Sequence, residues 1–76
     1  MKDGENKHFR DTLKFISPTE EGIIFESCSN KRRYIMPTKS LCVMLNSAII
    51  IKGVVMAEWS LIELNGKEYI LFLRSV

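Results

Sequence analysis

The chain has few of the residues from which catalytic and metal sites are built. Its 76 residues include one histidine and two cysteines, and Cys28 and Cys42 do not form a C-x-x-C arrangement. Together with His8 they lack the spacing of metal ligands, so we expect no metal site. A Cys–His nucleophile would also need a third residue that orients the histidine, and the sequence gives no sign of one. We expect both cysteines to be buried as small apolar residues.

Glycine is also scarce, and the four glycines are dispersed, so no glycine-rich loop is present to cradle a phosphate. The acidic pairs Glu20-Glu21 and Glu63/Glu68 fall at an expected turn and near a hairpin end. Solvated charges are far more common at such places than a catalytic dyad. We therefore expect no enzymatic activity, no cofactor and no small-molecule substrate.

No apolar run has the length of a membrane span. The longest, Leu41–Ala57, is interrupted by Asn46-Ser47 and Lys52, whereas a spanning helix needs about 20 mostly apolar residues. Residues 1–10 contain no apolar core of a secretory signal. These absences predict a cytoplasmic protein with two free thiols and no membrane partner.

Charge of one sign is not in strong excess either. The net charge is +2, with 26% charged and 46% hydrophobic residues, which is typical of a globular domain and too little charge to imply nucleic acid by itself. Residues 1–9 are polar and lack apolar periodicity, so we expect a flexible tail there. Residues 10–76 are then a single small domain.

Two hairpin patterns are the most informative features that the chain does have. Asn65-Gly66 supplies the two positive φ values of a type I′ turn between two apolar runs. Two-residue closure places Trp59 opposite Phe72 and Leu61 opposite Ile70. The sequence therefore predicts a hairpin over 58–74 whose register is fixed by its turn.

The earlier hairpin is predicted over 23–36. Centring its turn between Ser29 and Asn30 places Ile23 opposite Met36 and, nearer the turn, Glu26 opposite Arg33. A two-residue and a four-residue loop give the same pairing. Aromatic and opposite-charge pairs across such strands each contribute about 0.2–1 kcal/mol.

The remaining elements are inferred from shorter signals. Leu13, Phe15 and Ile16 open a first strand, and residues 17–20 are a turn rather than the start of a helix. After Pro37, a short helix over 38–46, capped by Thr38 or Ser40, is favoured over a strand through 41–45. The β-branched stretch 48–56 predicts a strand with a bulge or bend at Gly53.

These elements predict a mainly β or α+β domain of five to six short, largely antiparallel strands in a barrel-like or strongly bent sheet. A single short helix precedes the fourth strand. The element order β-β-β-α-β-β resembles that of an OB-fold, in topology alone.

Both faces of the last hairpin are apolar, which is the basis of our main functional hypothesis. A sheet with one wet face would show polar residues at alternate positions, so a helix, the wall of a closed barrel or another subunit must cover the second face. We expect a small binding protein that acts through protein–protein contacts as a homo-oligomer. Its expected interface comprises Trp59, Ile62, Tyr69, Leu71 and Leu73.

The alternative is a nucleic-acid-binding module. Lys31, Arg32 and Arg33 are the longest run of like charge and precede Tyr34 at the tip of the first hairpin. Cations beside an exposed aromatic ring suit phosphate contact and base stacking, and Arg10 and Lys14 could extend the site. In the competing interpretation, which the small net charge favours, Arg33 pairs with Glu26, Tyr34 packs on Phe25, and the other two cations are solvated.

Overall fold

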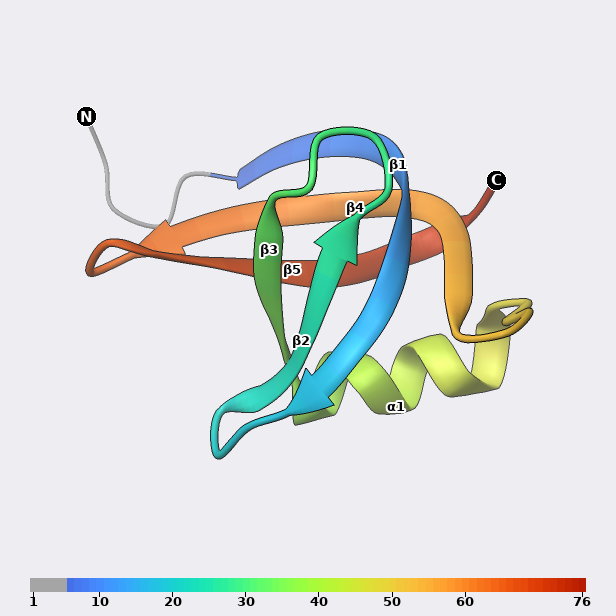
Figure 1. The fold of residues 1–76 in the computed structure, drawn as a ribbon, viewed down its shortest axis with the longest axis horizontal. Coiled ribbons are helices and arrows are strands. Elements are labelled where there is room, and N and C mark those ends of the chain that lie inside the picture. Colours follow the sequence, from blue (N-terminus) through green and yellow to red (C-terminus); the bar gives the residue numbers. More distant parts are fainter. Residues whose placement is uncertain (1–5) are drawn as a thin grey trace.

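The computed structural model of this protein describes residues 6–76. Six elements follow one another, with β1 first and β5 last (Figure 1). In order they are β1 (Asn6–Pro18), β2 (Gly22–Ser27), β3 (Arg33–Pro37), α1 (Thr38–Ser47), β4 (Val54–Leu64) and β5 (Lys67–Ser75). The architecture is mainly β with one short helix between β3 and β4, which confirms the predicted fold class.

The five strands form one ring-like sheet in the order β1-β2-β3-β5-β4. Neighbouring strands are antiparallel except β3 and β5, which are parallel and pair at Ile35 and Tyr69. A long ladder between β1 and β4, from Asn6 opposite Ile62 to Lys14 opposite Val54, completes the ring. Closure gives every strand an inner face that is buried without a second layer. The helix lies between β3 and β4, the position expected from the sequence.

The β2–β3 hairpin has the predicted register. Ile23 lies opposite Met36, and Glu26 lies opposite Arg33. The four residues 28–31 form the loop, closed by a 2.8 Å hydrogen bond from Ser27 N to Arg32 O. This loop is longer than a two-residue turn, yet it has the same centre, so the pairing is unchanged.

The β4–β5 hairpin also has the predicted register, with Trp59 opposite Phe72 and Leu61 opposite Ile70. Asn65 and Gly66 have φ values of 52° and 78°, the positive values that a type I′ turn requires. This hairpin extends well beyond the other strands along the longest axis of the molecule (Figure 1). Its turn therefore projects from one end of the ring.

The predicted helix over 38–46 is present as α1, so the alternative strand through 41–45 is wrong. The i, i+3, i+4 spacing of Leu41, Met44 and Leu45 predicts one apolar stripe on this helix. Met44 is buried and Leu41 packs against the core, but Leu45 is 59% exposed, so its place in the stripe is wrong. The helix packs against β5, β3 and β2 but not β4. It therefore covers one end of the ring (Figure 1).

Neither Thr38 nor Ser40 caps α1, contrary to expectation. The N-cap position is Pro37, which makes no side-chain capping bond. The hydroxyl of Ser40 instead accepts a 2.8 Å hydrogen bond from the backbone N–H of Phe72. β5 and β3 pair only at Ile35 and Tyr69. The hydroxyl therefore satisfies the buried N–H of Phe72, for which β3 supplies no acceptor.

Two expected boundaries are wrong: β1 begins earlier, and β4 begins later, than the sequence predicts. Residues 6–9, assigned to a tail, belong to β1, where Phe9 lies opposite Trp59 and packs against the core. Lys7 and His8 remain exposed, so polar side chains are compatible with this strand. The remainder of the expected tail, residues 1–5, lies outside the described residues.

The stretch 48–56 is not one strand. Only its last residues belong to β4; before them, Ile51 and Val54 exchange backbone hydrogen bonds of 3.0 and 3.1 Å around a tight turn. Lys52 and Gly53 occupy that turn with φ values of 54° and 76°. Gly53 therefore lies at a bend, as expected. The chain reverses direction there, directly after three consecutive isoleucines.

The core lies inside the ring. Trp59, fully buried, has its ring centre 5.9 Å from that of Phe72 and 6.3 Å from that of Phe25. Edge-to-face and tilted aromatic pairs of this kind stabilise a core beyond simple area burial. The other buried apolar side chains are Leu13, Tyr34, Met36, Met44, Val55, Ala57 and Ile70.

Candidate interaction surface

The predicted basic site lies at the connection between β2 and β3. Its residues differ in exposure and in ion pairing. Lys31, Arg32 and Arg33 are exposed. Arg32 Nη2 lies 2.8 Å from Glu68 Oε2, and Arg33 Nε lies 3.4 Å from Glu26 Oε1. Two of the three cations are therefore paired with carboxylates. The competing interpretation expected this of Arg33, whereas its expectation that Arg32 is only solvated is wrong.

Tyr34 is not an exposed aromatic, so that part of the nucleic-acid hypothesis is wrong. The residue is only 4% exposed and belongs to the core. It lies opposite Phe25 in the ladder, and its ring centre is 5.7 Å from that of Phe9. Burial raises the pKa of its hydroxyl, and Glu68 adds to this effect while Arg32 opposes it. A base has no access to the face of this ring.

The loop that carries the basic run is held by Asp11 of β1. Ser27 Oγ donates a 2.6 Å hydrogen bond to Asp11 Oδ2, and Ser29 Oγ lies 3.2 Å from both carboxylate oxygens. The backbone N–H groups of Ser29 and Asn30 donate to Ser27 Oγ. Since Ser27 is fully buried, we interpret this cluster as structural support for the loop.

The predicted interface residues of the last hairpin fall on two different faces. Trp59 is fully buried inside the ring and is not available to a partner, so its assignment to an interface is wrong. Ile62, Tyr69, Leu71 and Leu73 are half-buried and face outward. Among the described residues, no helix contacts β4. α1 packs against β5, the other strand of the hairpin. The four outward side chains nevertheless remain partly exposed, and we call Ile62, Tyr69, Leu71 and Leu73 a partly exposed apolar strip.

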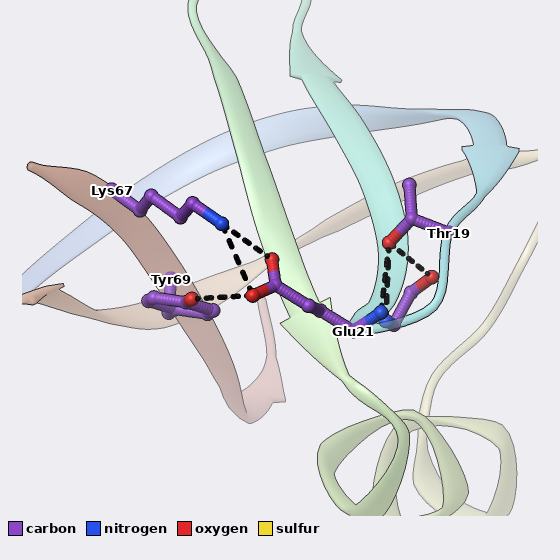
Figure 2. Close-up of polar contacts among 5 residues, drawn as sticks. Thr19, Glu21, Lys67 and Tyr69 are labelled. Atoms are coloured by element: carbon purple, nitrogen blue, oxygen red, sulfur yellow. Dashed lines mark hydrogen bonds and ion pairs between the residues drawn. The ribbon is translucent and has the colours of Figure 1, made fainter. Parts of the chain in front are cut away.

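Tyr69 is engaged in a polar cluster that connects the β1–β2 turn to β5 (Figure 2). Glu21 accepts hydrogen bonds from Lys67 Nζ at 3.1 and 3.3 Å and from Tyr69 OH at 3.3 Å. Thr19 Oγ1 accepts the backbone N–H of Glu21 at 3.2 Å, which fixes the turn. The hydrogen bond to Glu21 raises the pKa of Lys67. The cluster connects the β1–β2 turn to β5, and both oxygens of the Glu21 carboxylate accept a hydrogen bond within it.

A more exposed apolar surface lies at the turn between α1 and β4. Ile49 is 73% and Ile51 is 65% exposed. Nearby along the chain, Met56 of β4 is 58% exposed. Apolar side chains gathered at such exposures are unusual on a monomeric protein and mark contact sites. These isoleucines were expected in a strand, so this surface was not predicted from the sequence.

These side chains surround a concave site of about 470 Å³, which we call the isoleucine groove. It is lined by Thr12, Ile49, Ile51, Lys52, Val54, Met56, Ser75 and Val76. The groove lies where β1, the start of β4 and the end of β5 meet the turn that follows α1. A run of isoleucines ending in Lys52-Gly53 is a signal that could have revealed it, since two residues with positive φ reverse the chain there.

Cations border the groove on the β1 side. Thr12 lies opposite Met56, while its neighbours Lys14 and Arg10 lie opposite Val54 and Glu58. Alternate residues of a strand share a face, so both cations flank Thr12 on the side that lines the groove. Within residues 6–76, neither cation forms an ion pair.

The two cysteines do not take part in any of these surfaces. Both are free and exposed, so the expectation that they are buried is wrong. Among residues 6–76, no three His, Cys, Asp or Glu side chains gather in a way that could hold a metal ion. Within the same range, no helix is both long and apolar enough to cross a membrane.

Comparison with known proteins gives no assignment for this chain. No protein-family model, no curated protein and no solved structure matches it.

Proposed function

We propose that the protein is a non-enzymatic binding protein that self-associates through the isoleucine groove. The observation that carries the proposal is the exposure of Ile49, Ile51, Met56 and Val76, each of which is more than half exposed around one concave site. An apolar cavity with few polar groups is suited to receive apolar side chains of a partner.

Energetics support this role. Complete burial of a large apolar side chain stabilises by about 1.5–3 kcal/mol relative to leaving it exposed. A domain of this size buries only about 60% of its unfolded surface, so association is an effective source of further burial. Covering even two isoleucines would add appreciably to the stability of such a chain.

The proposed surface differs from the one expected from the sequence. Of the earlier set, Trp59 lies in the core and Tyr69 is bonded to Glu21. The half-buried Ile62, Leu71 and Leu73 remain a secondary apolar strip. Their lower exposure gives them less surface to bury, so we place the main contact at the groove.

Sedimentation velocity over a concentration series tests the proposal. We expect the sedimentation coefficient of the wild type to rise with concentration, and the double variant Ile49→Ser/Ile51→Ser to remain monomeric. Val43→Ser is the matched control, because Val43 is 53% exposed on α1 and does not line the groove. A wild type that stays monomeric from low to high micromolar concentration would reject self-association.

The nucleic-acid alternative has weaker support. Lys31, Arg10 and Lys14 are exposed and without an ion pair among the described residues. If these cations contact phosphates, the logarithm of the binding constant should fall as log[salt] rises, with a slope of about −0.7 per contact on a single strand. The double variant Lys31→Ser/Arg32→Ser should then weaken binding of mixed oligonucleotides. Absence of binding by the wild type at low salt would remove this alternative.

A further inference from the structure

The tip of the β4–β5 hairpin carries an apolar side chain and a carboxylate at successive positions, on opposite faces of the strand. The residue opposite the apolar one, Leu64, is Lys67, whose charge is paired with Glu21. Leu64, the last residue of β4, is 42% exposed. Its neighbour Glu63 is exposed and, within residues 6–76, forms no ion pair. The residue opposite Glu63 is Glu68, whose carboxylate is bound by Arg32. We call residues 63–66 the hairpin tip.

The isoleucine groove has the complementary character. Lys52 lines it, and Arg10 and Lys14 flank Thr12 on the same side. The adjacent carboxylates are already neutralised: Glu58 Oε1 lies 2.8 Å from Arg74 Nη2, and Glu26, opposite Lys14, is paired with Arg33. The groove is therefore apolar inside and positively charged at its border.

This charge pattern disfavours a symmetric contact of one groove with another. A two-fold dimer across the grooves would bring the positively charged border of one groove, which includes Lys14 and Lys52, against the same border of its partner. Like charges brought together at an interface are strongly unfavourable and exclude such pairings. An occupant that carries an apolar side chain and a negative charge avoids this cost, and the hairpin tip carries both.

The two surfaces lie at opposite ends of the molecule. The tip projects from one end of the longest axis, which measures 36 Å, while the turn after α1 and the end of β5 lie at the other (Figure 1). The tip therefore cannot occupy the groove of its own chain. A copy that receives one tip still presents a free tip, so the contact is heterologous and can be repeated.

We propose that the occupant of the isoleucine groove is the hairpin tip of a second copy, with Leu64 entering the groove and Glu63 facing its cations. The proposal rests on the self-association proposed above and specifies its geometry. Assembly proceeds head to tail, through open chains or closed rings, rather than through a two-fold dimer.

A mixing experiment tests this geometry. Leu64→Ser removes the apolar side chain of the tip and leaves the groove intact, whereas Ile49→Ser/Ile51→Ser disables the groove and leaves the tip intact. Each variant alone should be monomeric by sedimentation. An equimolar mixture should form one-to-one dimers and nothing larger, because only one productive contact remains.

Charge variants supply a second, independent measurement. Glu63→Lys should raise the dissociation constant for self-association and make it less sensitive to salt. Glu20→Lys is the control, since Glu20 is an exposed carboxylate in the β1–β2 turn, and it should assemble as the wild type does. Circular dichroism establishes that each variant is folded.

The outcomes separate the two proposals. A monomeric wild type would reject self-association itself. If the wild type and both tip variants assemble alike while the groove variant is monomeric, self-association stands and the head-to-tail geometry is rejected. A mixture of tip and groove variants that remains monomeric would also overturn it.

Discussion

Trp59 Nε1 donates a 3.0 Å hydrogen bond to the backbone carbonyl of Asp11. This bond satisfies the one polar atom of a side chain that is otherwise enclosed by aromatic rings. The carboxylate of Asp11 meanwhile accepts hydrogen bonds from Ser27 and Ser29. A single residue of β1 is thus connected to the core through its backbone and to the β2–β3 loop through its side chain.

Asp11→Asn tests the contribution of that carboxylate. The amide retains the shape but replaces one accepting oxygen with a donor, so it cannot accept from both serines as before. Hydrogen bonds to charged groups contribute about 1.5–3 kcal/mol, and we expect a loss of this size in the free energy of unfolding, measured by urea denaturation. Glu20→Gln, at an exposed carboxylate of the β1–β2 turn, is the control and should change it by less than about 0.5 kcal/mol. An Asp11→Asn variant as stable as the control would contradict this structural role.

Among the glycines of residues 6–76, Gly22 is the least tolerant of a side chain. A Cβ there would overlap the carbonyl oxygen of Met36, which belongs to the paired strand β3 and cannot move aside alone. We expect Gly22→Ala to lower the free energy of unfolding by at least ~3 kcal/mol, above the usual range for overpacking. Gly66→Ala meets no atom within 4 Å and bears only the cost of a positive φ, about 1–2 kcal/mol. Equal losses for the two variants would show that steric overlap at Gly22 is relieved.

Tyr34 should titrate above the usual tyrosine value of about 10. The cause is burial, which raises the pKa of its hydroxyl. The chain has two tyrosines. In the Tyr69→Phe variant only Tyr34 remains, so its ionisation can be followed by ultraviolet absorbance. A midpoint at or below that of a free tyrosine would contradict its place in the core.

The same shift predicts how stability depends on pH. Because the pKa of Tyr34 is higher in the folded than in the unfolded chain, its stabilising effect is complete below about pH 10 and is lost as the pH rises through the folded value. The Tyr34→Phe variant should lose less stability over that alkaline range. Lys67, whose pKa is also raised, is present in both proteins and does not affect the comparison.

The basic run should matter little for folding. Lys31→Ser/Arg32→Ser removes an exposed ion pair with Glu68, and such pairs contribute about 0–1 kcal/mol. Phe25→Ala removes a buried aromatic ring, at an expected cost of about 3–5 kcal/mol. Thermal or chemical unfolding of the two variants checks the contrast. Comparable losses would mean that the loop charges support the core.

Local signals explain what the sequence predicted correctly. The Asn65-Gly66 turn and the centre of the loop at Ser29-Asn30 each determine a register between adjacent strands, because the pairing follows from the turn alone. The helical spacing likewise predicted the contact of Leu41 and Met44 with the core, although Leu45, expected on the same stripe, is exposed.

Non-local packing explains the errors. Both faces of the last hairpin are apolar, so periodicity could not decide which one holds Trp59. Polar residues such as Lys7 and His8 gave no strand signal, because their pairing depends on β4. The isoleucines before Lys52 have high β propensity, yet the turn at 52–53 places them outside the sheet. The groove arises only when these distant segments meet.

The closing ladder of the ring joins residues 6–14 to residues 54–62. Residues 6–11 pair with β4 alone, whereas β2 pairs with β1 only from Leu13 onward. During synthesis, this half of β1 must therefore wait until most of the later elements have emerged from the ribosome. Contacts so distant in sequence are reached slowly, in milliseconds to seconds rather than the microseconds of local helical folds. The strand that is made first is thus among the last to be fixed in place.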